Sequence, residues 1–174
     1  MTDFRLANKN DASVYAHLIN QSWKDTYGEY ISIEHIDNEF NIEKIVNTFE
    51  KHINDTTFET YMIQYNGQIV GLVEFGSPDV EDVYKEDLES FGQLRRLYIN
   101  KSYQDLGIGK ETERFVSRSL IKKGYKYSFL WVKKQNNKAI HFYEKCGYVK
   151  SEYTCENPSD GAPSFVMEKV LEEE

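Results

Sequence analysis

The stretch LRRLYINKSYQDLGIGK, residues 94–110, decides the fold. It opens with a short run of β-forming residues that ends at Ile99, and a polar break follows. Two glycines, Gly107 and Gly109, then precede a long helical pattern that begins at about Lys110. Glycine lets a backbone approach an anion closely, and a helix start adds unpaired N–H groups and the positive end of the helix dipole. The stretch therefore predicts a buried strand followed by a phosphate-binding loop that opens a helix.

Two common nucleotide-binding motifs do not fit this loop. The dinucleotide fingerprint needs a third glycine at position 112, where Thr112 stands. The Walker loop needs glycine where Gln104 stands and Ser or Thr where Glu111 stands. The glycines then mark either a phosphate loop of another kind or an ordinary strand-to-helix turn.

Composition narrows the class of protein. The chain has 174 residues and is most simply one domain over residues 1–174. Its net charge of −8 disfavours a nucleic-acid binder, because affinity for phosphate backbones is built from clustered Lys and Arg. No signal peptide or apolar run of membrane-spanning length is apparent, so we expect a cytoplasmic protein. Cys146 and Cys155 suggest neither a disulfide framework nor a metal site.

The first half of the chain reads as a strand, two helical regions and a hairpin. A short strand around Phe4 precedes a helix that Asn10 or Asp11 is expected to cap and Tyr27-Gly28 to end. One further helical region follows, from about Ser32 until residues 52–55 break it. Asn66-Gly67 lies between two β-rich runs and is a strong hairpin signal.

The second half alternates strands and helices. A buried strand ends at Val132, a short helix capped by Asn136 or Asn137 follows, and two strands close the chain, the last at residues 164–170. Residues 79–89 and 156–163 read as loops. The strand–helix–strand of residues 94–132 predicts a right-handed parallel crossover. The fold class is therefore α/β, a mixed, mostly antiparallel sheet with helices on both faces.

Two motifs carry a resemblance to a known family. Residues 104–109, QDLGIG, resemble the Q/R-x-x-G-x-G/A loop with which GCN5-related N-acetyltransferases (GNAT) hold the pyrophosphate of acetyl-CoA. Residues 136–148 resemble the family's N-x-x-A-x-x-F-Y-x-x-x-G-aromatic motif. The order of elements resembles the same fold along the whole chain.

The resemblance implies an acetyl-CoA-dependent N-acetyltransferase, in which a primary amine attacks the thioester directly in a ternary complex. Main-chain groups of the central strand would hold the pantetheine arm and the thioester. The residues implied in cofactor binding are Leu97, Tyr98, Ile99, Gln104, Asp105, Leu106, Gly107, Ile108, Gly109, Lys110, Asn136, Phe142 and Tyr143.

Two residues are candidates for proton transfer. Tyr143 matches the family's general acid for the departing thiolate; the alternative is a half-buried helix aromatic. In some family members a glutamate on the central strand acts as the general base. In this chain Gln93 stands near that position. Glu74 is the substitute candidate, and the alternatives are a solvated surface carboxylate or a water chain.

The acceptor is predicted to be an amine. Trp23 and Tyr27 could hold an alkyl ammonium through cation–π contact, and the alternative is core packing. Arg95-Arg96 and Lys133-Lys134 either steer the phosphates of CoA or are surface charge. Many GNAT members pair as homodimers, but no stretch marks an interface. The second functional hypothesis is a module that senses acyl-CoA without turnover, motivated by the missing strand glutamate.

Overall fold

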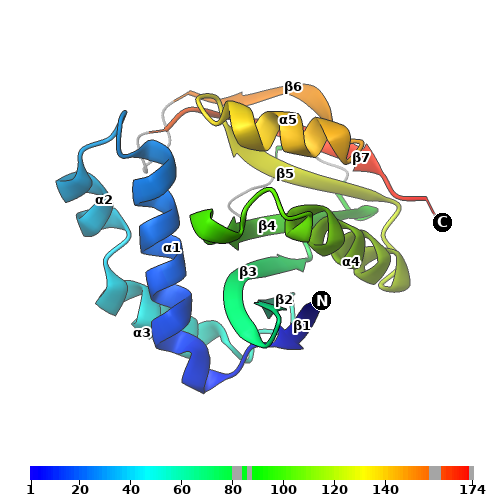
Figure 1. Cartoon of the computed structure of the whole chain (residues 1–174). Helices are drawn as coiled ribbons and strands as arrows, with labels where there is room; N and C mark the ends of the chain where they lie inside the picture. The colour runs from blue at the N-terminus through cyan, green and yellow to red at the C-terminus, as the bar shows by residue number, and fades with distance from the viewer. Residues whose placement is uncertain (80–83, 86–87, 157–161, 173–174) are drawn as a thin grey trace. The chain divides into compact units, whose positions relative to one another are not determined.

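The computed structural model describes residues 1–79, 84–85, 88–156 and 162–172. The chain forms two compact units. The first contains residues 1–74 and 96–111, and the second contains residues 75–95 and 112–174. Hydrogen-bonded strands follow one another in the order β1-β2-β3-β4-β5-β7-β6 (Figure 1). Strands β3 (Gln68–Gly76) and β4 (Phe91–Ile99) contribute residues to both units. The prediction of a single domain stays a prediction.

The first unit joins antiparallel strands to a group of helices. Strand β1 (Thr2–Leu6) pairs antiparallel with β2 (Phe58–Tyr65). Asn66 and Gly67, with φ values of 51° and 80°, join β2 to β3, which confirms the predicted hairpin. The remaining elements of this unit are the short 3-10 turns η1 (Lys9–Asp11) and η2 (Lys101–Tyr103) and the helices α1 (Ala12–Tyr27), α2 (Ile33–Glu39) and α3 (Ile42–His52).

Helix α1 supplies much of the first core. Its apolar residues recur at helical spacing, so one face is buried. This face packs with Ile36 of α2, Phe49 of α3 and Leu72 of β3. The buried members from α1 are Ala12, Tyr15, Ile19, Trp23 and Tyr27.

One local prediction for this unit was wrong, and another was confirmed only for the position of the residue. The helical region after Ser32 is two helices, because Asn41 begins α3 by accepting the backbone N–H of Lys44 at 3.2 Å. Asn10 caps no helix. Asp11 occupies the N-cap position of α1 but makes no side-chain cap bond. Its carboxylate instead accepts from the backbone of Asn8 at 2.8 Å and pairs with Arg5 at 2.7 Å.

The second unit contains the predicted parallel crossover. Strands β4 and β5 (Tyr127–Lys133) are parallel, with Phe91 opposite Tyr127. Helix α4 (Ile108–Lys122) connects them, and its residues from Thr112 onward belong to this unit. Gly92 permits the close packing of α4, since a Cβ there would lie 2.5 Å from the Leu120 side chain.

The last two strands extend this unit antiparallel. Strand β7 (Ser164–Val170) pairs with both β5 and β6 (Val149–Cys155), and helix α5 (Asn137–Lys145) precedes β6 (Figure 1). Leu88, Phe91, Phe129 and Val166 form a buried cluster. The predicted mixed α/β sheet is confirmed. The predicted loops at residues 79–89 and 156–163 lie partly outside the described residues.

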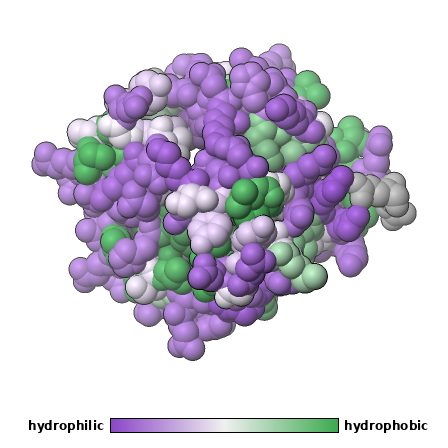
Figure 2. Space-filling model, in the orientation of Figure 1, coloured by the Kyte–Doolittle hydropathy of each residue, from purple (hydrophilic) through white to green (hydrophobic). Residues whose placement is uncertain are grey.

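The face of the molecule drawn in Figure 2 is mainly hydrophilic. Figure 2 shows polar residues over most of the visible face, with scattered apolar side chains. No described helix is both long and apolar enough to cross a lipid bilayer.

Candidate active site

The glycine loop of the first unit has the backbone shape that an anion site needs. Gly107 has φ +83°, a conformation that disfavours any residue with a side chain. A Cβ built at Gly107 would meet no atom within 4 Å, so space is open beside the backbone there. Helix α4 begins at Ile108, two residues earlier than predicted. The N–H groups of its first turn therefore belong to residues of the loop itself.

Side chains hold the loop in this shape. The Gln104 amide donates to the Ile99 carbonyl at 3.0 Å, which ties the loop back to the end of β4. Asp105 also has a positive φ, +63°, so the chain turns sharply before Gly107. Ile108 is buried and anchors the helix start, whereas Leu106 is exposed. Gln104 and Ile108 thus have structural roles in addition to the cofactor contacts that the resemblance implies.

Strand β4 leads into this loop with half-buried side chains. Tyr98 packs against the first core, and its hydroxyl accepts a hydrogen bond from the Trp23 indole at 3.1 Å. Leu97 and Ile99 point to the opposite face, because side chains alternate along a strand. The structure thus brings Leu97, Tyr98, Ile99 and residues 104–110 together in one unit.

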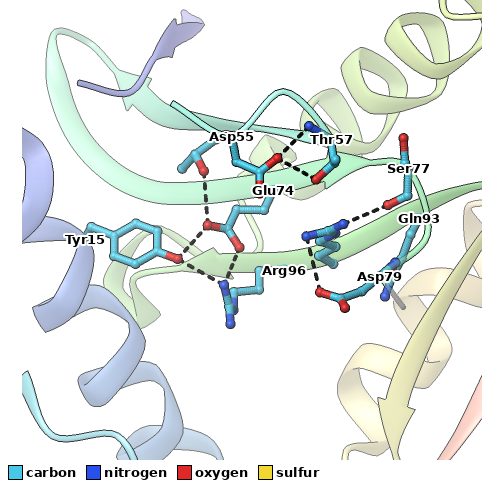
Figure 3. A network of polar contacts seen from close by, with 10 residues as sticks. Tyr15, Asp55, Thr57, Glu74, Ser77, Asp79, Gln93 and Arg96 are labelled. Atoms are coloured by element: carbon cyan, nitrogen blue, oxygen red, sulfur yellow. Dashed lines mark hydrogen bonds and ion pairs between the residues drawn. The ribbon is translucent and has the colours of Figure 1, made fainter. Parts of the chain in front are cut away.

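Glu74 is not a solvated surface carboxylate, because its side chain is 2% exposed. Its Oε1 atom accepts from the hydroxyl of Tyr15 at 2.5 Å (Figure 3) and from the hydroxyl of Thr60 at 3.1 Å. Its Oε2 atom pairs with Nη1 of Arg96 at 2.5 Å. Both carboxylate oxygens of Glu74 are therefore occupied by partners and shielded from solvent. This geometry disfavours the predicted role of Glu74 as the base that deprotonates the acceptor.

The contacts around Glu74 also shift the pKa values of its neighbours Tyr15 and Arg96. Burial and the adjacent Glu74 charge raise the pKa of Tyr15 well above its ordinary value. The Glu74 carboxylate raises the pKa of Arg96, so Arg96 is cationic at every physiological pH. Tyr15 was missed as a member of a site, and Arg96 was considered only for steering the phosphates of CoA or as surface charge. A signal was present, since Glu74 and Arg96 are charged residues inside β-rich runs, where burial demands a partner.

Gln93 and Arg95 have structural roles in the second unit. Oε1 of Gln93 accepts the backbone N–H of Asp79 at 2.7 Å, and Arg95 donates to the Ser77 carbonyl at 2.9 Å. Arg95 also lies 3.4 Å from the Asp79 carboxylate. These bonds fasten the chain after β3 to strand β4. Arg95 is therefore an internal cation, not surface charge.

The aromatic residues predicted to bind the amine lie in the core. Trp23 and Tyr27 are buried, at 5% and 8% exposure. The Trp23 ring stacks on Phe40 with centroids 3.9 Å apart and packs on Tyr27 at 4.7 Å. This arrangement is the core-packing alternative, and it disfavours the cation–π role predicted for both residues.

The second motif lies in the second unit, on helix α5. Asn136 caps α5 by accepting the Ala139 N–H at 3.0 Å. Phe142 and Tyr143 are half-buried, and the Tyr143 ring packs on Tyr148 with centroids 5.6 Å apart. Of the lysines considered for phosphate steering, Lys134 pairs with Glu156 at 2.5 Å on the surface. The catalytic role of Tyr143 stays a prediction.

Comparison with known proteins defines the class. The model of the Acetyltransferase (GNAT) family matches residues 17–148, most of the chain. The chain belongs to this family and is an acetyl-CoA-dependent N-acetyltransferase of it, with acetyl-CoA as co-substrate.

Particular relatives span the full chain. A spermidine N(1)-acetyltransferase of Thermoplasma acidophilum is 25% identical over 174 residues, 98% of both chains. The solved PaiA N-acetyltransferase of the same organism, in complex with coenzyme A, aligns with a TM-score of 0.74 at 22% identity, over 98% of this chain and 99% of that one. The aminoglycoside acetyltransferase AAC(6')-Ib, also solved with coenzyme A, gives 0.74 at 17% identity, over 98% and 95%.

Proposed function

We propose that this protein transfers the acetyl group of acetyl-CoA to the primary amine of a small molecule or peptide, by direct attack of the amine in a ternary complex. The observation that carries the proposal is the shape of the loop at Gly107. Its positive φ and open Cβ position leave the backbone accessible at the start of a helix, where N–H groups and the helix dipole favour a pyrophosphate.

The roles of individual residues follow from this proposal. Residues 104–110 hold the pyrophosphate, and main-chain groups at Leu97 and Ile99 orient the pantetheine arm and the thioester. The Tyr143 phenol protonates the departing thiolate of CoA, which is general acid catalysis. Glu74 does not take the proton of the acceptor in this proposal, since its side chain is buried and both of its oxygens already have partners.

Relatives as distant as these support several classes of amine as the acceptor. One relative is named as a spermidine acetyltransferase and another as an aminoglycoside acetyltransferase. Both names describe amine acceptors, which supports a primary amine for this chain. A polyamine, an amino sugar, an amino acid and a peptide N-terminus are therefore the candidates.

The decisive experiment measures free thiol released from acetyl-CoA across a panel of these amines, together with calorimetric binding of CoA. Amine-dependent release supports the proposal. A second candidate function, sensing acyl-CoA without turnover, is favoured by one observation: residue 93 is an amide, Gln93, and the Glu74 carboxylate is buried in fixed hydrogen bonds, so neither position presents a free carboxylate. Tight CoA binding with no release from any amine would support the sensor.

A further inference from the structure

We propose that Arg96 recognises a carboxylate on the acceptor, so that the preferred acceptors are amino acids and not polyamines. This inference rests on the proposed function, because it concerns the amine that attacks acetyl-CoA. It is carried by the cluster of Arg96, Glu74, Tyr15 and Thr60, all within the first unit.

The guanidinium of Arg96 has hydrogen-bonding capacity left over. Arginine carries five N–H donors. Nη1 of Arg96 uses its two, on Glu74 at 2.5 Å and on the Tyr15 hydroxyl at 3.1 Å. Among the described residues, Nη2 and Nε of Arg96 make no hydrogen bond. These two nitrogens form the edge of the guanidinium that binds a carboxylate through two parallel bonds.

The Arg96 side chain is also accessible. It is 47% exposed, whereas the side chain of its partner Glu74 is 2% exposed. A ligand that reaches this cluster therefore meets the cation and not the anion. A second ammonium group, such as a polyamine carries, would be repelled there, and a carboxylate would be attracted.

The orientation of Arg96 is fixed before a ligand arrives. Tyr15 donates to Glu74 and accepts from Arg96, so the three side chains close a ring of hydrogen bonds (Figure 3). The Thr60 hydroxyl adds a bond to the same Glu74 oxygen at 3.1 Å. Preorganisation of this kind lowers the entropy lost on binding. Glu74 thus positions Arg96. This role explains why a carboxylate that is poorly placed to act as a base is buried here.

The place of Arg96 on strand β4 suits a contact with the acceptor. Arg96 precedes Leu97, whose main chain is proposed to orient the thioester. The side chains of Arg96 and Tyr98 share one face of the strand, because residues two apart point the same way. Both contact helix α1, at Tyr15 and Trp23. An anion held by Arg96 would therefore lie next to the proposed reacting centre.

The test compares each amino acid with its own carboxamide. Glycine, β-alanine and glutamate are assayed for thiol release beside glycinamide, β-alaninamide and glutamine α-amide, with spermidine as the cationic acceptor. We expect kcat/KM to favour at least one acid over its amide by about tenfold to a hundredfold, the range for bonds to a charged group. In Arg96→Gln this preference should disappear, while calorimetric affinity for CoA stays unchanged.

A matched control separates recognition from stability. Arg5 also pairs with a buried carboxylate, that of Asp11, and its side chain is 37% exposed. Arg5→Gln should cost stability and leave the ratio of acid to amide unchanged. If Arg96→Gln fails to fold, the double variant E74Q/R96Q removes both charges of the pair together and should also lose the preference.

The outcomes separate the two proposals. Release with spermidine or with amides at rates equal to those with acids, unchanged in Arg96→Gln, would overturn the role of Arg96 and leave the acetyltransferase proposal standing. Absence of release with every amine would overturn the proposed function, and this inference with it.

Discussion

At the scale of single residues, backbone conformation defines the cofactor loop more clearly than side-chain identity. Gly107 and Gly67 share nearly the same φ, +83° and +80°, and a Cβ at either would meet no atom within 4 Å. One lies in the proposed pyrophosphate loop and the other in the turn between β2 and β3. Substitutions at these two glycines therefore distinguish the stability lost to backbone strain from the loss of affinity for CoA.

We predict that Gly107→Ala weakens CoA binding by about tenfold or more, whereas Gly67→Ala leaves it unchanged. Both variants should lose about 1 kcal/mol of stability, because both place a Cβ at positive φ. Calorimetric titration with CoA and urea unfolding measure the two effects. Equal CoA affinity in the two variants would show that the loop does not hold the pyrophosphate.

Tyr143 carries the residue-level prediction for chemistry. Removal of its hydroxyl in Tyr143→Phe should lower kcat by about a hundredfold or more, the usual contribution of a positioned general acid. CoA affinity should change little, since the ring and its packing on Tyr148 remain. Tyr148→Phe is the control: Tyr148 is buried, and its hydroxyl bonds Ser128 at 2.9 Å. The control variant Tyr148→Phe should have lower stability and an unchanged kcat. An unchanged kcat in Tyr143→Phe would exclude the acid role of Tyr143.

At the scale of elements, helix starts were the least predictable feature. Asn41 and Asn136 both begin helices by accepting the N–H three residues on, yet only Asn136 stood in a motif that named it. The apolar pattern of residues 36–49 runs across the break at Asn41, so periodicity alone merges α2 and α3. In the same way, a sequence does not show that the Asp11 carboxylate turns away from α1 to pair with Arg5.

These two caps give a matched pair of variants. Asn41→Ala and Asn136→Ala should each destabilise the protein by about 1 kcal/mol, the typical value of an N-cap. Only Asn136→Ala should also weaken CoA binding, if Asn136 reaches the pantetheine arm as the family resemblance implies. Urea unfolding and CoA titration of both variants test this. If both variants lose the same stability and bind CoA equally well, Asn136 has a capping role alone.

At the scale of the whole molecule, the β-hairpin and the parallel crossover were predictable and the polar network was not. The hairpin at Asn66-Gly67 and the crossover through α4 followed from local signals, and both are confirmed. The ring of Tyr15, Glu74 and Arg96 joins residues up to 81 positions apart. No local pattern specifies such a pairing. The packing of Trp23 likewise depends on Phe40, which lies on another segment.

Acid sensitivity is a prediction for the molecule as a whole. The Arg5 hydrogen bond is the main cause that lowers the pKa of Asp11 below its ordinary 3.8. The folded state therefore gains stability above about pH 4, and that gain is lost as the pH falls through the folded pKa. Asp11→Asn should lose about 1–2 kcal/mol at pH 7, and the two proteins should converge in stability as the pH falls below the folded pKa of Asp11. Urea unfolding across this range measures it, and Asp3→Asn, which alters an exposed residue, should stay within about 0.5 kcal/mol of the wild type at every pH.

The interleaving of the two units along the chain also limits how such a protein can be recombined. The chain leaves the first unit after residue 74, returns at residue 96 and leaves again after residue 111. A hybrid gene with a single junction at residue 74 would pair one parent's Tyr15 and Glu74 with the other parent's Arg96. Exchange of acceptor preference between relatives would therefore require two grafted segments, since the cation and the carboxylate that orients it are inherited on separate pieces of the gene.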